Sequence, residues 1–133
     1  MADALRDRDE MLRHLRPELR PGRWVFVVSE DPELAAQARG FFHEDEGLTL
    51  IVPEASARDA GLATDLPMRQ ITLAVESALN GVGLTAAVAE ALARYGIPCN
   101  VVAAFHHDHI FVPADRAQDA LAVLETLQRK ADD

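Results

Sequence analysis

The most constraining feature of the sequence is the order of elements predicted in its C-terminal half. The alternation at Arg69–Val75 predicts a strand, and the apolar spacing at Leu84–Tyr95 predicts an amphipathic helix. The runs Cys99–Phe105 and His109–Val112 predict a hairpin joined through a histidine-rich turn, and a helical stripe at Ala117–Leu127 closes the series. The predicted order is therefore strand, helix, strand, strand, helix.

This order is one strand short of the ferredoxin-like unit. The strand at Arg69–Val75 would leave one row of backbone groups bare, because the chain ends after the second helix. The run Arg23–Val28 is apolar on both faces, so we expect it to cover that edge. We predict an α/β (α+β) fold of two interlocked halves, 1–66 and 67–133, with an antiparallel sheet and helices on one face.

The N-terminal half carries weaker signals. A helix is predicted over Asp3–Leu15 and ends before Pro17. Asp31 and Pro32 predict a helix start, and Leu48–Val52 predicts a strand. The remaining predictions are an acidic connector at His43–Glu46 and two helical turns at Pro53–Ala60.

Composition narrows the class of protein. The net charge of −9 argues against nucleic-acid binding, because phosphates would be repelled. No apolar run is long enough for a membrane span, and the charged first ten residues lack an export signal. Cys99 is the single cysteine, which fits a reducing compartment. We therefore expect a cytoplasmic protein.

Longer phrases carry a family resemblance. The phrase GVGLTAAVAEALARYGIPCNVVAAFHHDHIFVP, with PGRWVFVVSE and EGLTLIVPEASA before it, resembles small bacterial proteins with paired ACT domains. The match covers roughly Glu18–Leu127. The sequence is also similar to the ACT modules of amino-acid sensors. The resemblance implies a non-catalytic regulatory module that binds a small ligand, with amino acids as the expected class, at an interface between units. It also implies a homodimer, and a signal would have to reach a separate, unidentified protein partner.

The loop Asn80, Gly81, Val82, Gly83 is the first candidate ligand site, because glycines permit close approach and a helix start at Leu84 favours a carboxylate. In ACT domains this loop commonly holds the ligand backbone. We also count Asn100 among the expected contacts, and Asp108 as the acceptor for an ammonium group. The alternative is a tight strand-to-helix connection with nothing bound.

The stretch with His106, His107 and His109 is first interpreted as a structural turn. A metal site is a further alternative, although nothing else in the sequence is spaced to complete a zinc tetrahedron. We expect no cofactor. No Gly-x-Ser-x-Gly elbow is present, so an enzyme is the least favoured class. The remaining rival is a structural dimerisation domain without a ligand.

Overall fold

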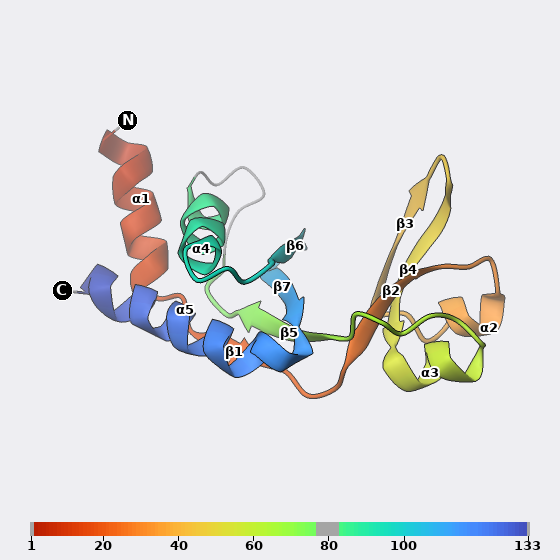
Figure 1. Ribbon diagram of the computed structural model, residues 1–133. Coiled ribbons are helices and arrows are strands. Elements are labelled where there is room, and N and C mark those ends of the chain that lie inside the picture. Colours follow the sequence, from red (N-terminus) through yellow and green to blue (C-terminus); the bar gives the residue numbers. More distant parts are fainter. Residues whose placement is uncertain (1, 77–82, 133) are drawn as a thin grey trace.

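The computed structural model describes residues 2–76 and 83–132 (Figure 1). Its strands are β1 (Pro17–Leu19), β2 (Trp24–Val28), β3 (Gly40–Glu44), β4 (Gly47–Pro53), β5 (Met68–Leu73), β6 (Asn100–Ala103) and β7 (Asp108–Pro113). Its α-helices are α1 (Ala2–Arg13), α2 (Pro32–Ala35), α3 (Glu54–Asp59), α4 (Leu84–Ala93) and α5 (Ala117–Asp132), and a 3₁₀ turn η1 (Ala114–Arg116) precedes α5.

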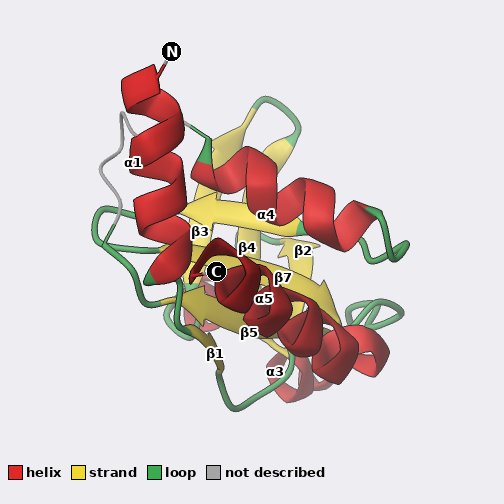
Figure 2. Cartoon of the chain, turned by 90° about the vertical axis from the view of Figure 1, so that its left-hand side faces the viewer, coloured by secondary structure: helices red, strands yellow, loops and turns green. Residues whose placement is uncertain are grey.

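All the strands join one antiparallel sheet. Its order is β3-β4-β2-β5-β7-β6, and β1 pairs with β5 beside β2. The side chains that alternate toward the helices are apolar and buried, as the sequence predicts for β5. The predicted fold class, an antiparallel sheet with helices packed on one face, is confirmed (Figure 2).

The strand that covers β5 differs from the prediction. The three residues of β1 pair with Leu73, Thr72 and Ile71, whereas β2 meets β5 only at Trp24↔Met68. The sequence does not mark β1, because Pro17 directly after a helix is typical of a helix end. In the structure Arg16 has φ 47° and turns the chain directly from α1 into the sheet. The two halves are interlocked, but through β1 more than through Arg23–Val28.

A second difference lies at His43–Glu46, which was predicted to be a connector. Residues Gly40–Glu44 form β3, an edge strand paired with β4 from Gly40↔Ile51 to Glu44↔Gly47. Edge strands need no buried face, and Phe41 and Phe42 are 64% and 70% exposed. The alternation that marks a half-buried strand is therefore missing from this stretch.

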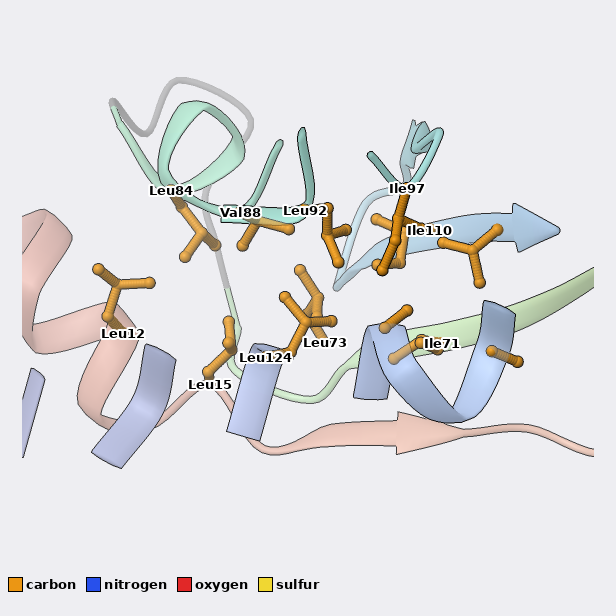
Figure 3. Packing of buried hydrophobic residues seen from close by; sticks show 13 residues of the cluster. Leu12, Leu15, Ile71, Leu73, Leu84, Val88, Leu92, Ile97, Ile110 and Leu124 are labelled. Atoms are coloured by element: carbon orange, nitrogen blue, oxygen red, sulfur yellow. The ribbon is translucent and has the colours of Figure 1, made fainter. Parts of the chain in front are cut away.

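The larger core lies between α1, α4, α5 and the strands β5 and β7 (Figure 3). It joins distant parts of the chain, since Leu12 and Leu15 pack with Leu124. The smaller core lies under α2 and α3 and consists of Val25, Leu34, Leu50, Val52 and Ala57. No helix within residues 2–76 and 83–132 is long and apolar enough to cross a membrane.

Candidate ligand-binding site

The candidate site is built at the start of α4. Gly83 is the N-cap residue with φ +96°, and no side chain of the described residues caps the helix. A left-handed backbone of this kind favours glycine, and the first turn of a helix leaves N–H groups without intrahelical partners. Leu84 is 4% exposed and anchors the helix in the core (Figure 3). The predicted contacts Asn80, Gly81 and Val82 lie outside the described residues.

Arg8 of α1 lies directly against this helix start. A Cβ on Gly83 would stand 3.2 Å from the Arg8 Cδ and 3.3 Å from its Cγ. The guanidinium Nη2 is 3.2 Å from the Asp9 Oδ1, and the Arg8 side chain is 38% exposed. The Arg8 atoms that lie against Gly83 belong to its aliphatic stem, and its guanidinium pairs with Asp9. The positive end of the helix dipole favours an anion at this place. No local pattern in the sequence marks the contact between α1 and α4.

Asp108 does not lie in the predicted turn. The turn is closed by the Ala104 N–H, which donates to the His107 carbonyl oxygen at 3.1 Å. Asp108 begins β7, pairs with Leu73 and is 6% exposed. The shorter turn follows from the β5 register, which extends the ladder through Asp108. Because Leu73 ends β5, Asp108 lies where the chain leaves the sheet toward α4.

Asn100 is held elsewhere. Its Nδ2 donates to the Phe111 carbonyl oxygen at 3.2 Å and contacts the Met68 Sδ at 3.7 Å. It begins β6 opposite Phe111, at the other end of the hairpin from Asp108. Alternation along β7 puts Asp108 on the side of the buried Ile110, which faces the helices. The structure therefore does not bring Asn100 to the α4 site.

The three histidines have different surroundings. His106 Nδ1 is 3.7 Å from the Glu76 Oε1, and His107 Nδ1 is 3.3 Å from the Val75 carbonyl oxygen. His109 Nδ1 lies 3.1 Å from Gln70 Nε2 and 3.0 Å from Thr72 Oγ1. Among the residues that the structure describes, no three His, Cys, Asp or Glu side chains are placed to hold a metal ion.

Among the described residues, the side chains of Cys99 and His109 have a shifted pKa. Burial, followed by the charge of His107, lowers the pKa of His109 below its usual 6.5 and so favours the neutral imidazole. The half-buried Cys99 thiol has its pKa raised by burial, which disfavours the reactive thiolate. The Cys99 thiol therefore lacks the lowered pKa that an activated thiol nucleophile needs.

Comparison with known proteins identifies the class. Two models of the ACT domain match in tandem, at residues 4–69 and 65–126. The chain belongs to the ACT-domain family. ACT domains are typically regulatory modules that bind small ligands.

Solved structures agree with this assignment. A crystal structure of a protein of unknown function from Vibrio cholerae, described as a possible transport protein, is 40% identical with a TM-score of 0.80 over 92% of this chain and 94% of that one. A protein from Agrobacterium tumefaciens is 17% identical with a TM-score of 0.63 over 84% of this chain and 87% of that one.

The ligand-free regulatory subunit of aspartate kinase from Thermus thermophilus is 11% identical, with a TM-score of 0.61 over 86% of this chain and 97% of that one. At these low identities, the Agrobacterium and Thermus structures show a shared fold. Comparison with curated proteins gives no significant match.

Proposed function

We propose that this protein is a non-catalytic sensor that binds a free amino acid at the start of α4. The proposal rests on the family and on one observation, the contact between Gly83 and Arg8. A free amino acid carries a carboxylate and an ammonium group about one carbon apart. The first N–H groups of α4 and the Arg8 guanidinium are donors for the carboxylate.

The ammonium group needs an acceptor nearby. Asp108 carries a carboxylate at the end of the sheet from which the chain runs to α4. Asp108 is 6% exposed, so a ligand that reaches it would be largely withdrawn from water, where a charged hydrogen bond is stronger.

We further propose a cytoplasmic homodimer. The described sheet order ends in the edge strands β3 and β6, whose outer backbone groups are not paired within the described sheet. Side-by-side pairing of one such edge with its copy would be isologous and would give a two-fold dimer. The single Cys99 fits a reducing compartment. The resulting signal would be passed to a separate protein.

A thermal-shift screen of the twenty amino acids and common divalent metals tests the function. A ligand that binds only the native state stabilises it by about 2.7 kcal/mol at a hundredfold excess over its Kd. We expect one amino acid, or a group of chemically similar ones, to raise the melting temperature. A response to metals alone would support the histidine site instead, and no response would support a dimerisation domain without a ligand.

A further inference from the structure

A pocket separate from the α4 site lies where the two parts of the sheet meet. It is an open pocket of about 720 Å³, in the size range of small-molecule sites. The turn Pro21–Gly22 between β1 and β2 forms one wall, and the start of α3 forms another. Trp24 and Arg69 also line it, near the single register pair Trp24↔Met68 that joins β2 to β5.

Two buried hydrogen-bond donors of this pocket have no partner in the described part of the chain. They are the Trp24 indole Nε1 and the Arg69 Nε. Trp24 is 9% exposed, and its Nε1 edge faces Gly22, where an added Cβ would stand 3.4 Å from that nitrogen. A buried donor without an acceptor costs about 1–3 kcal/mol. Both groups can only donate, so the missing partner must be an acceptor.

The charges around the pocket favour an anionic acceptor. Arg23 and Arg69 line it, and the Arg39 guanidinium stacks on the Trp24 ring at 4.4 Å. Among the described lining residues the one acid is Glu54. It already pairs with Arg23 (Nε–Oε1 3.2 Å) and with Arg58 of α3. This local excess of guanidinium groups stands out in a chain with a net charge of −9.

We propose that this pocket binds a small anion with a phosphate or carboxylate group, which accepts hydrogen bonds from Trp24 Nε1 and Arg69 Nε. Both nitrogen atoms are shielded from water, and Gly22 of the exposed Pro21–Gly22 turn lies next to Trp24 Nε1, so the anion reaches this nitrogen when the turn moves aside. Arg69 Nη2 already donates to the Arg20 carbonyl oxygen at 2.9 Å, which fixes the guanidinium in place. The site is separate from the α4 site and is independent of the amino-acid proposal.

Trp24 is the only tryptophan, so its fluorescence reports directly on this pocket. The full chain is titrated with inorganic phosphate and with citrate, using sodium chloride at equal ionic strength as the reference, and binding is also followed by calorimetry. We expect a saturable change in Trp24 emission with at least one of them. Saturation with phosphate alone identifies a phosphate-bearing ligand, and saturation with citrate alone identifies a carboxylate. If neither fluorescence nor calorimetry detects binding of phosphate or of citrate, the proposal is wrong.

Variants locate the binding. Arg69→Met should weaken binding about tenfold or more, since it removes a charged donor. Arg116→Met is the matched control, because Arg116 also donates to a backbone carbonyl, that of Tyr95, at 3.1 Å and lies outside the pocket. Arg23→Gln, at an exposed position, should weaken binding severalfold and serves if Arg69→Met does not fold. If a folded Arg69→Met protein binds the anion as tightly as the parent chain, the anion does not bind in this pocket. Gly83→Ala, at the α4 site, should not change the affinity for the anion.

Discussion

The two ends of the sheet are covered very differently. The β5 and β7 end lies under helices of 12, 10 and 16 residues, and its core contains thirteen buried residues of the described chain. The β2, β3 and β4 end lies under helices of four and six residues, over a core of five. Burial of apolar area is the main favourable term in folding, so we expect the second end to be the less stable one.

The larger core also explains why the sequence halves do not match the packed units. Leu12 and Leu15 of the N-terminal arm belong to it, and β1 covers the free edge of β5 (Figure 3). The C-terminal half of the sequence therefore lacks part of its own core. The packed unit with the larger core, at the β5 and β7 end, therefore depends on residues from the N-terminal half of the sequence.

The largest expected effect comes from separating the halves. A fragment of residues 67–133 should not fold, because it loses β1 and the two leucines that pack against Leu124. Amide spectra and thermal melts of the fragment check this. A cooperative melt with dispersed amide signals would contradict the interlocked arrangement.

Matched leucine truncations compare the two cores directly. Leu124→Ala and Leu50→Ala both remove a side chain that is 0% exposed. We expect a loss of about 4 kcal/mol for Leu124 and about 2–3 kcal/mol for Leu50, since the smaller core under short helices collapses more easily around a cavity. Urea unfolding of both variants measures the difference. A larger loss at Leu50 would reverse the proposed ranking.

His109 should make stability depend on pH. Its folded pKa is lowered, so the unfolded chain takes up the proton first as the pH falls. Its contribution is present above the unfolded value of about 6.5 and is lost as the pH falls through that value toward the folded pKa. The decrease in urea midpoint between pH 7.5 and pH 5 should be smaller in His109→Gln. His14→Gln, at an exposed histidine of α1, is the control. An unaltered pH dependence in His109→Gln would exclude this residue as a source.

The smallest expected effects come from one ion pair at each end. Glu54 is 17% exposed at its side chain and bridges Arg23 and Arg58, so Glu54→Gln should cost about 1 kcal/mol. Glu90 pairs with Arg94 at 2.7 Å on α4 but is 66% exposed, and Glu90→Gln should cost about 0.3–0.5 kcal/mol. If denaturant unfolding gives the same loss of stability for both variants, the second ion pair of Glu54 contributes no additional stability.

The locally determined elements were the predictable ones. Gly96, with φ +68°, stands where a left-handed residue is typical after a helix such as α4, and the predicted helix start at Asp31 is confirmed, since Asp31 accepts from the Glu33 N–H at 3.0 Å. Both features depend on a glycine or a capping side chain at a fixed offset from the helix. The face of β5 that carries Ile71 and Leu73 is buried as predicted, but the alternation wrongly indicated an open opposite face, since Gln70 and Thr72 are only 3% and 8% exposed.

The features that the sequence did not reveal depend on long-range pairing. The β1 pairing, the exposed strand β3 and the register that draws Asp108 into β7 are set by partner strands and have no periodic pattern of their own. The contact of Arg8 with Gly83 depends in the same way on how α1 packs. The family resemblance indicated the candidate loop, but this nearby cation could be found only in the structure.

Calorimetric titration of the amino acid selected by thermal shift tests the central claim most directly, using the parent chain, Gly83→Ala and Gly96→Ala. Both glycines have positive φ, so both variants are strained, but a Cβ on Gly83 meets Arg8 at 3.2 Å whereas one on Gly96 meets nothing within 4 Å. We predict that Gly83→Ala weakens binding about tenfold or more and that Gly96→Ala binds like the parent. If folded Gly83→Ala binds as tightly as Gly96→Ala and the parent, the ligand does not lie at the start of α4.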